Sequence, residues 1–567
     1  MFIFASSRKS TVLCTIQLCS FFSLYAQVLT PFEHRDLQLL KTYSDIPGVI
    51  AQVDRTKTII GHAYLEEQLL NLLVDSSQLY KRQEKVKLLL RNSELSQIIS
   101  NELQLFAAHQ NPLHVLKHED TPCKKMLEHF YFKNKYVSWL NKHPIGLECG
   151  QALQMISLFA PIIEHAVIHF LVNEKLHNYL GMCCSHSHHK HKHSHVTPSW
   201  LSQTAYYTYN IAHGAIHVMG AKELFEHVYR QYQVIREMQL FLSHIRVCLQ
   251  IRDRLVATLT AFPEFEELLA AENQTEEFKE FSRLVMADTI NITHFEIARP
   301  GNVLRAYSLF ESVQDELVNY CKPVALTDFY NSIAFVYDEH RSTNTPYTFC
   351  TYLEDQKPQL KINGFWNPLF ATPQSIDFTV NVGNTDPACV VMTGQNKAGK
   401  STNLYACVAT VILGQSLGIA PAHYCAFTPF EHIFTGFNMP ARVVEGASLF
   451  TTTLEFTNSI FKVAQSKRIL VVLDELFNST HHTKGATLAE LFLQQLVTKT
   501  DALALVSTHF SQLHNLQHTH PNLFTMLMVE RSDEDTDAQY HIERGFLPSS
   551  EYDESFNENL LYTVDVF

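Results

Sequence analysis

The sequence is poor in three features, and each absence argues against a class of protein. It contains no long run of Lys or Arg and has a formal net charge of −13, which argues against a generally basic protein that coats nucleic acid. Its 12 cysteines lack the paired spacing of a metal-binding module, so we expect most of them to be buried thiols. The apolar runs at residues 11–24 and 153–163 are shorter than the roughly 20 residues that span a membrane, which disfavours stable membrane insertion.

The remaining composition is that of a large folded chain. Hydrophobic residues make up 46% of the 567 residues and charged residues 18%, which is enough apolar material for sizeable cores. A chain of this length is expected to form two or three domains.

A glycine-rich segment at residues 394–402 fits the phosphate-loop pattern G-x-x-x-x-G-K-[ST]. It follows an apolar run at residues 388–392, typical of a buried strand, and precedes a predicted helix at residues 403–414. Glycines let main-chain N–H groups approach a triphosphate, and a helix N-terminus adds partial positive charge. We expect ATP to be bound by Gly394, Asn396, Lys397, Ala398, Gly399, Lys400, Ser401 and Thr402.

Two further apolar segments end in polar residues. Residues 469–473 are typical of a buried parallel strand and lead into Asp474 and Glu475, at the strand end where such sheets open onto their site. Asp474, with the Ser401 hydroxyl, is placed to hold Mg²⁺, and Glu475 to activate the attacking water. The alternative, two ordinary terminal acids, is the weaker interpretation after a phosphate loop. Residues 502–506 form the next predicted strand, which leads to His509.

These segments resemble the ATPase domain of the MutS family of DNA mismatch-repair proteins. The similarity is carried by Thr393-Gly-Gln-Asn396, Gly446-Ala-Ser-Leu-Phe450, Leu473-Asp-Glu-Leu476 and Thr508-His509, in the family's order. The resemblance implies an α/β P-loop NTPase domain of the ABC-like type that hydrolyses ATP with Mg²⁺. It implies Lys400, Glu475 and His509 as the catalytic residues, with His509 contacting the γ-phosphate.

The resemblance also implies a homodimer that acts on DNA. Gly446 and Ser448 precede a predicted helix at residues 452–464, and in such ATPases this segment closes over the neighbouring subunit's γ-phosphate. Taken alone, a Gly-x-Ser segment can equally be a helix cap.

The chain departs from the family pattern at two places. Gln395, Lys397 and Ala398 stand where the family usually has Pro, Met and Gly. Residues 477–480, Phe-Asn-Ser-Thr, replace Gly-Arg-Gly-Thr. The second departure concerns the signalling loop of the dimer rather than the Mg²⁺ site.

Upstream, residues 53–61 resemble the strand that starts the MutS core, and the apolar stripe of Leu65, Leu69, Leu72 and Leu73 predicts helix through residues 65–90. We expect a core-like helical and lever domain at residues 35–345, the ATPase domain at 355–545 and an acidic tail at 546–567. This layout leaves no room for the family's N-terminal mismatch-reading domain. Phe262-Pro-Glu264 fits the tripeptide of that domain but lies in a predicted acidic helix at 262–281.

Two segments leave alternatives open. Residues 1–30 contain a signal-like leader with a plausible cleavage point at 25–27, yet an ATP-dependent DNA protein is expected in the cytoplasm, with this N-terminus uncleaved. Residues 185–195 are either an exposed loop at the tip of a helical hairpin or a site for Zn²⁺, Cu²⁺ or Ni²⁺. The candidate ligands are His186, His188, His189, His191, His193 and His195.

The function we expect is ATP hydrolysis coupled to dimer and arm closure on mismatched or otherwise irregular DNA. One alternative keeps the ATPase but directs it to branched or recombination DNA, or away from repair. The other is a membrane-associated or exported metal-handling protein with a degenerate ATPase, against which the intact Lys400, Asp474 and Glu475 argue.

Overall fold

The structure, a computed structural model, combines helical and α/β parts. It describes residues 28–41, 48–114, 138–152, 167, 200–268, 274–290, 300–355, 357–369, 376–383, 386–395, 397–437, 449–478, 481–532 and 539–545. The chain divides into two compact units. The first combines Met1–Ala107, Leu255–Ala270 and Lys322–Phe567, and the second combines Ala108–Arg254 and Ala271–Cys321.

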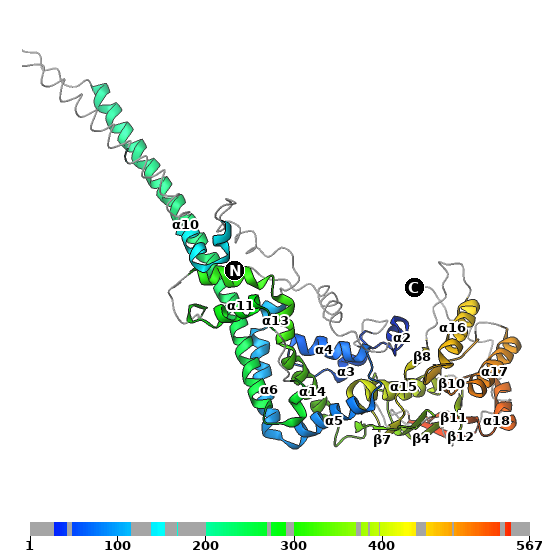
Figure 1. Cartoon of the computed structure of the whole chain (residues 1–567). Helices are drawn as coiled ribbons and strands as arrows, with labels where there is room; N and C mark the ends of the chain where they lie inside the picture. Colours follow the sequence, from blue (N-terminus) through cyan, green and yellow to red (C-terminus); the bar gives the residue numbers. More distant parts are fainter. Residues whose placement is uncertain are drawn as a thin grey trace, which may run out of the picture. The chain divides into compact units, whose positions relative to one another are not determined.

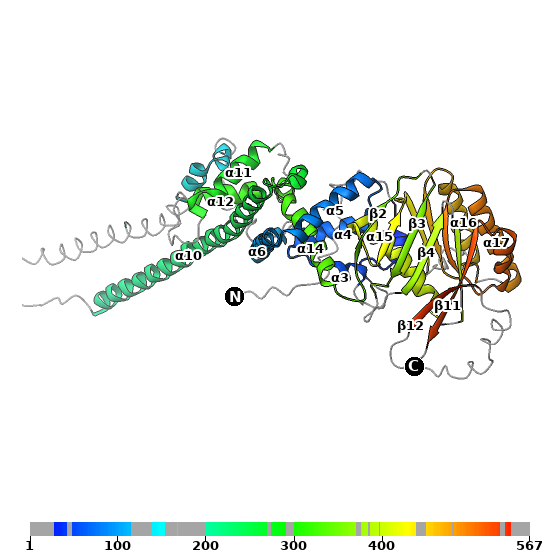
Figure 2. The same cartoon turned by 90° about the horizontal axis from the view of Figure 1, so that it is seen from below.

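The largest sheet of the first unit has six strands in the order β12-β11-β5-β10-β9-β8, of which β11 and β12 are labelled in Figure 2. Neighbouring strands from β11 to β8 are parallel, and β12 is antiparallel to β11. The three strands predicted from apolar runs are all present, two of them displaced by one residue. The bounds are β5 Cys389–Thr393, β8 His432–Gly436, β9 Ile469–Leu473, β10 Leu503–Ser507, β11 Phe524–Ser532 and β12 Gln539–Arg544.

The core of this sheet is formed by strands whose residues are buried on both faces. Every residue of β5, β9 and β10 is buried, as continuous Val- and Leu-rich runs predict. Helices α16 (Leu449–Ala464) and α17 (His482–Lys499) contribute Ile460 and Leu493 to the same apolar cluster. The short helices η8 (Ser511–His514) and α18 (Asn515–Thr519) follow β10.

Helix α15 (Lys400–Leu417) follows the phosphate loop and is almost entirely buried. It contacts β9 and β10 of the large sheet and also α4, α5, β3 and β6. Gly418 ends it in the left-handed conformation, with φ 83°. The helix predicted at residues 403–414 is therefore present and is longer at both ends.

Two smaller sheets complete the β structure of the first unit. In the order β2-β7-β3-β4, strand β3 is antiparallel to both of its neighbours. A separate antiparallel pair joins β1 and β6. The bounds are β1 Thr348–Phe349, β2 Thr351–Tyr352, β3 Gln359–Phe365, β4 Ile376–Gly383, β6 Ile419–Ala420 and β7 Tyr424–Phe427.

Several helices of the expected helical domain belong to the same compact unit as the sheets. Helix α14 contacts α4 and α5, and these two contact α15. The compact units therefore divide the chain differently from the predicted ranges 35–345 and 355–545. The bounds are α2 Pro31–Asp36, α3 Val49–Val53, α4 Ile59–Leu70, α5 Ser76–Arg91, α6 Ser93–His109 and α14 Lys322–Glu339.

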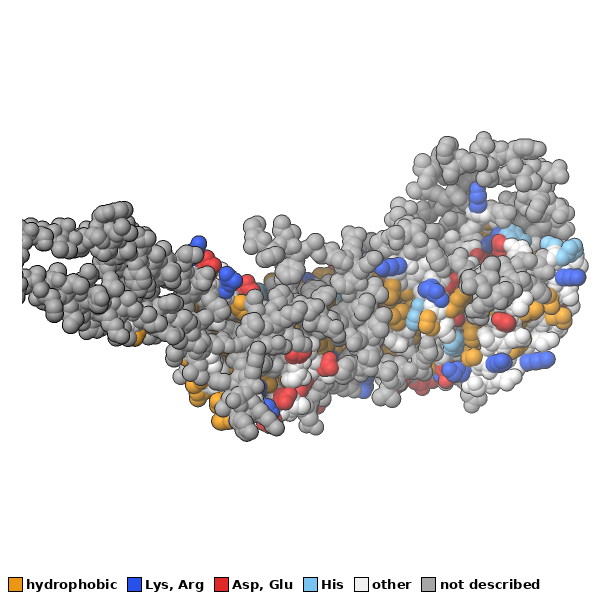
Figure 3. Space-filling model, turned by 90° about the horizontal axis from the view of Figure 1, so that it is seen from above, with side chains coloured by type: hydrophobic (Ala, Val, Ile, Leu, Met, Phe, Trp, Pro, Cys, Tyr) orange, Lys and Arg blue, Asp and Glu red, His pale blue; other side chains and the backbone are white. Residues whose placement is uncertain are grey.

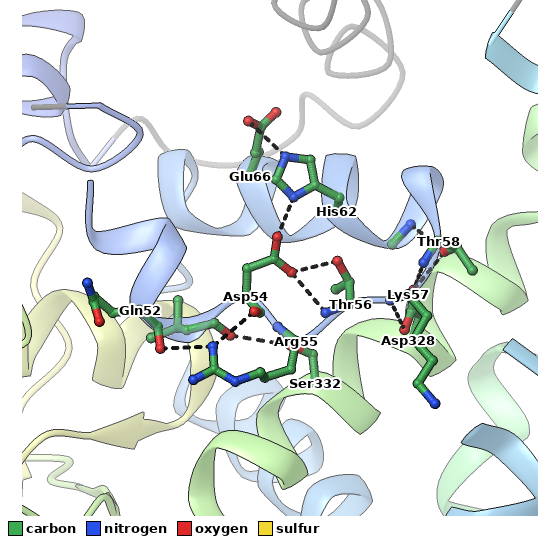
Figure 4. A network of polar contacts seen from close by, with 12 residues as sticks. Gln52, Asp54, Arg55, Thr56, Lys57, Thr58, His62, Glu66, Asp328 and Ser332 are labelled. Carbon is green, nitrogen blue, oxygen red and sulfur yellow. Dashed lines mark hydrogen bonds and ion pairs between the residues drawn. The ribbon is translucent and has the colours of Figure 1, made fainter. Parts of the chain in front are cut away.

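The strand expected at residues 53–61 is absent, and that prediction was wrong. Helix α3 ends at Val53 and α4 begins at Ile59. Between them the main chain bonds to side chains of α14, for instance Arg55 N to Ser332 Oγ at 2.8 Å, instead of to a neighbouring strand (Figure 4). The predicted stripe of Leu65, Leu69, Leu72 and Leu73 is buried, but its last two members lie in the connection between α4 and α5.

The second unit is helical in its described part. Most residues of the long helix α10, Trp200–Leu259, belong to this unit (Figure 1). The last residues of α10, from Leu255 onward, are assigned to the first unit. Residues 144–152 are also helical, and further helices of this unit are α7 Asn111–His114, η4 Ser138–Lys142, α11 Glu276–Met286, η6 Asp288–Ile290, α12 Pro300–Phe310 and α13 Gln314–Tyr320.

The prediction of a single acidic helix at residues 262–281 was also wrong. The chain forms a 3₁₀ helix, η5 (Pro263–Leu268), and α11 starts only at Glu276. The Thr275 side chain accepts a hydrogen bond from Phe278 N and so caps a new helix at that point.

On the face drawn in Figure 3, the described Lys and Arg side chains are dispersed among hydrophobic, acidic and His side chains. Within the described residues, no helix is both long and apolar enough to cross a membrane. Among the described cysteines, six are buried and Cys149 is exposed.

Candidate nucleotide-binding site

The phosphate-loop segment follows β5 in a conformation that depends on glycine. Gly394 has a φ of 151°, and a Cβ there would lie 2.3 Å from the Val529 main-chain oxygen. Gly399 has a φ of 99° and stands directly before α15. Lys397 lies in the left-handed region at φ 67° although it is not glycine, and its side chain is exposed. Such a non-glycine residue stores strain of order 1–3 kcal/mol, which is typical of functional loops.

Lys400, the first residue of α15, is 5% exposed and its side chain turns back into this loop. Its Nζ donates to the Gly394 oxygen at 2.9 Å and to the Gln395 oxygen at 3.0 Å. Burial lowers the pKa of Lys400, while the nearby carboxylates of Glu475 and Asp474 act to raise it. The loop thus surrounds a cation that the two acids of the next motif face.

Other residues expected to contact phosphate lie at or just before the N-terminus of α15. The Asn403 main-chain and side-chain nitrogens donate to the Gly399 oxygen at 2.9 and 2.8 Å, which fixes the start of the helix. Ser401 is exposed, Thr402 is half-buried and Ala398 is buried. Asn396 lies outside the described residues. An 18-residue helix that starts at this point carries partial positive charge at its N-terminus.

Sheet topology brings the predicted motifs to one edge. Strand β10 lies between β5 and β9, and all three are parallel. Their carboxyl ends are therefore adjacent. Strand β5 leads into the phosphate loop, β10 into His509 and β9 into the Asp474–Glu475 pair. Thr508 N donates to the Met392 oxygen at 3.1 Å, which ties the end of β10 to the end of β5.

Asp474 is fixed by contacts on both sides. Its main-chain nitrogen donates to the Gly436 oxygen at 3.0 Å, at the end of β8. Its Oδ1 accepts a hydrogen bond from the Ser507 hydroxyl. Ser507 is fully buried, so the Asp474 carboxylate is oriented by a donor that packing holds in place.

Glu475 is the most constrained acid of the site. It has a φ of 51°, and its main-chain nitrogen donates to the Ser507 oxygen at 3.2 Å and to Ser507 Oγ at 3.1 Å. Its Oε1 lies 2.8 Å from His509 Nε2, and its Oε2 accepts from Asn478 Nδ2 at 2.6 Å. The hydrogen bond from His509 is the main cause of a lowered pKa of Glu475, with burial opposing it. Glu475 is therefore ionised at neutral pH.

Two residues of this arrangement were missed by sequence reasoning. Ser507 was read only as part of the step to His509, although a hydroxyl next to an acid-bearing strand end was an available signal. Asn478 was seen only as a departure from a family pattern, and nothing in the sequence indicated that it contacts Glu475.

Other predicted site residues are not described by the structure. Gly446 and Ser448, the expected contacts to a neighbouring subunit's γ-phosphate, lie outside the described residues. The six histidines of the 185–195 tract, most of the 1–30 leader and the tail at 546–567 lie outside them as well. These assignments remain predictions.

Comparison with known proteins points to one family. Residues 390–552 match the family model for MutS domain V. The chain is 27% identical over 273 residues to DNA mismatch repair protein MutS of Carboxydothermus hydrogenoformans, which covers 46% of this chain and 30% of the relative.

Two eukaryotic relatives match shorter stretches. DNA mismatch repair protein Msh6 of Gallus gallus is 33% identical over 131 residues, 23% of this chain and 10% of the relative. DNA mismatch repair protein MSH6 of Saccharomyces cerevisiae is 31% identical over 194 residues, 32% of this chain and 16% of the relative. The chain thus spans less than a third of the length of these relatives. The C-terminal part of the chain is therefore similar to domain V of the MutS family.

Proposed function

We propose that this chain is a Mg²⁺-dependent ATPase of the MutS type, with a nucleotide domain of the ABC-like P-loop class. The observation that carries this proposal is the shared edge of β5, β10 and β9. That edge unites a phosphate loop, a histidine and an Asp-Glu pair, and the Lys400 cation faces both acids. A single accidental motif would not place its partners on neighbouring parallel strands.

The phosphate loop binds the triphosphate in this proposal. Main-chain N–H groups at residues 394–402 and the N-terminus of α15 face the phosphate oxygens, and Lys400 exchanges its two carbonyl partners for the β/γ-phosphates. The glycine conformations at 394 and 399 support a loop shaped for close approach by its main chain.

The residues present fit a Mg²⁺ site. Ser401 offers an exposed hydroxyl in the first turn of α15, and Asp474 a carboxylate that Ser507 orients; both are the hard oxygen ligands that Mg²⁺ takes. Mg²⁺ held there would neutralise charge on the β- and γ-phosphates. We assign Ser401 and Asp474 to hold it.

Glu475 and His509 then serve the hydrolysis step. An ionised, half-buried carboxylate can accept a proton from an attacking water. His509 holds one oxygen of that carboxylate and stands at the end of β10, next to the phosphate-loop strand. We assign it a contact to the γ-phosphate.

Assembly and substrate follow from the family. The relatives are named as DNA mismatch repair proteins, and we propose that this chain acts on mismatched or otherwise irregular DNA, in the compartment that holds ATP and DNA. We further propose a homodimer in which Gly446 and Ser448 of one subunit close over the γ-phosphate held by the other. ATP hydrolysis would change how the helical arms hold the DNA.

ATP turnover by Glu475→Gln tests the catalytic assignment. Replacing the carboxylate by an amide should reduce turnover about 10²–10⁴-fold while Mg²⁺-dependent ATP binding persists, because only the proton acceptor is lost. Glu94→Gln, at an exposed position in the first turn of α6, is the control and should retain wild-type turnover. Native turnover by Glu475→Gln would show that another group activates the water.

DNA binding needs its own experiment, because the nucleotide site does not define the substrate. Binding to homoduplex, single-mismatch and four-way branched DNA should be measured with and without ATP. The proposal expects preference for mismatched DNA and a change of affinity on adding ATP. Preference for branched DNA would move the function to recombination intermediates, and no DNA binding would place the ATPase outside repair.

A further inference from the structure

The carboxylate of Glu475, in the turn after β9, is held by two side-chain donors. Asn478 Nδ2 donates to Oε2 at 2.6 Å, and His509 Nε2 lies 2.8 Å from Oε1. The two donors come from different elements, since Asn478 belongs to the turn after β9 and His509 follows β10. Each oxygen of the carboxylate therefore has its own protein partner.

The turn itself is fixed by its main chain and by burial. The main-chain nitrogen of Asn478 donates to the main-chain oxygen of Glu475 at 3.2 Å, which closes the turn. Glu475 and Phe477 both have positive φ, at 51° and 62°. The Phe477 side chain is 3% exposed and belongs to the apolar cluster under the sheet, so packing holds this unusual backbone. Asn478 is exposed and contributes nothing to that core.

A carboxylate offers about four lone-pair sites, and the two donors occupy two of them. The remaining sites stay available to a water molecule, while rotation about the Glu475 side chain is restrained. Orientation of a base within hydrogen-bond reach of its proton is the first requirement of general base catalysis.

We propose that Asn478 is a positioning residue for Glu475, fixing one carboxylate oxygen while His509 fixes the other. This inference rests on the ATPase function proposed above. It also gives meaning to a departure from the family pattern, because Asn478 stands where Gly-Arg-Gly-Thr would place an arginine. This chain thus uses a neutral donor where a charged one would bind the carboxylate more tightly and make it a weaker base.

The test is ATP turnover by Asn478→Ala, Asn478→Asp and Asn478→Arg in the full chain, with kcat and KM for ATP measured separately. Asn478→Ala should lower kcat about 10-fold or more with KM for ATP within about twofold, the loss expected for one hydrogen bond to a charged group. The loss should fall on kcat, because the orientation of the base is lost while the groups that bind ATP are retained.

The other two variants order the series. Asn478→Asp should lower kcat further, because a like charge beside Glu475 adds to the lost donor. Asn478→Arg should recover part of the kcat that Asn478→Ala loses, because it restores a donor. The control is Asn363→Ala, which removes an equally short bond, from Asn363 Nδ2 to Thr379 Oγ1 at 2.6 Å, in the small sheet.

Two results would overturn the proposal. One is an unchanged kcat in Asn478→Ala. The other is an equal loss of kcat in Asn478→Ala and Asn478→Arg, which would indicate a structural role only. Absence of ATP turnover in the wild-type chain is a different outcome, since it would refute the proposed ATPase function itself.

Discussion

Two carboxylates of the first unit, Asp328 of α14 and Glu475 after β9, are each held by several hydrogen bonds, but from different kinds of donor. Asp328 is fully buried, and three of its four hydrogen bonds come from main-chain nitrogens of the segment before α4 (Figure 4). Glu475 is half-buried and its carboxylate is held by the side chains of Asn478 and His509.

The Asp328 network fixes the connection between α3 and α4. Its oxygens accept from Lys57 N at 3.0 and 3.1 Å and from Thr58 N and Thr58 Oγ1 at 2.7 Å. Thr58 in turn caps α4 by accepting from Gly61 N. A Cβ at Gly61 would lie 2.2 Å from Asp328 Oδ2, so this glycine makes room for the carboxylate.

The difference between the donors indicates the difference in role. Main-chain donors cannot rearrange without unfolding the segment, so Asp328 serves stability. Side-chain donors can move when a nucleotide arrives, and half-burial leaves Glu475 open to water. A carboxylate that must take up and release a proton needs the second arrangement.

Apart from loss of the proposed catalytic base, the largest expected effect is in Lys400→Ala. Removing the cation that we propose contacts the phosphates should weaken ATP binding and reduce turnover by about 10²–10³-fold or more. Folding should be unaffected, because the lysine donates only to loop carbonyls. Lys499→Ala, an exposed lysine in the last turn of α17, is the matched control for titration with a fluorescent ATP analogue.

Asp328→Ala should have the opposite profile. It leaves the buried N–H group of Thr58 and the partly buried N–H group of Lys57 without their acceptor, and we expect a loss of about 3 kcal/mol in the free energy of unfolding. Turnover per folded molecule should remain near the wild-type value. Urea denaturation followed by circular dichroism measures the first quantity, and turnover at saturating ATP the second. A stable but inactive Asp328→Ala would break the comparison.

The pH dependence sharpens this prediction. Burial is the main cause that raises the pKa of Asp328 to about 6, above its ordinary value of 3.8. Between about pH 4 and 6 the folded state therefore retains a proton that the unfolded state releases, so the contribution of Asp328 to stability falls as pH rises through that window. Asp328→Asn, which cannot titrate, should remove this dependence.

The same contrast explains what could be predicted from the sequence. The predicted nucleotide site depends on short local patterns: an apolar run, a glycine-rich loop and acids at a strand end. Lys400, Asp474 and Glu475 could therefore be predicted from the sequence alone. The contacts of Asp328 join residues about 270 positions apart in the chain, and no periodicity reveals them. The strand expected at residues 53–61 failed for this reason, because its main chain bonds to side chains of α14.

Local competition explains the other errors. Thr275 starts a new helix within the range 262–281, where apolar and acidic content alone suggested one continuous helix. Asn478 was misjudged because a departure from a pattern says which residue is missing and not what its replacement contacts.

A smaller effect is expected from Ser507→Ala. This buried hydroxyl donates to Asp474 Oδ1 and accepts from Glu475 N at 3.1 Å. Its loss frees the Asp474 carboxylate and removes one of the two contacts of the Glu475 main-chain nitrogen. We expect a decrease in turnover of about 10-fold, equivalent to about 1–1.5 kcal/mol, with a higher Mg²⁺ concentration needed for half-maximal rate. Thr457→Ala removes a comparable buried hydroxyl on α16 and controls for packing. Unaltered Mg²⁺ dependence in Ser507→Ala would separate Asp474 from the metal.

The smallest effect is expected in the second unit, where a pair of histidines takes the place of the carboxylates. His109 Nδ1 and His244 Nδ1 lie 2.9 Å apart, and the pKa of His244 is lowered, first by burial and then by the charge of His109. His244 therefore binds a proton more weakly in the folded unit than in the unfolded chain. The free energy of unfolding should fall as pH drops below the ordinary histidine pKa of about 6.5. Thermal melting at pH 7.5 and 5.5 should show a loss of a few degrees on acidification in the wild type and a smaller loss in His244→Gln. His143→Gln, a histidine that contacts Trp139 in the same unit, is the control and should keep the full loss. An equal acid sensitivity in wild type and His244→Gln would mean that groups other than this pair govern the response of the second unit to pH.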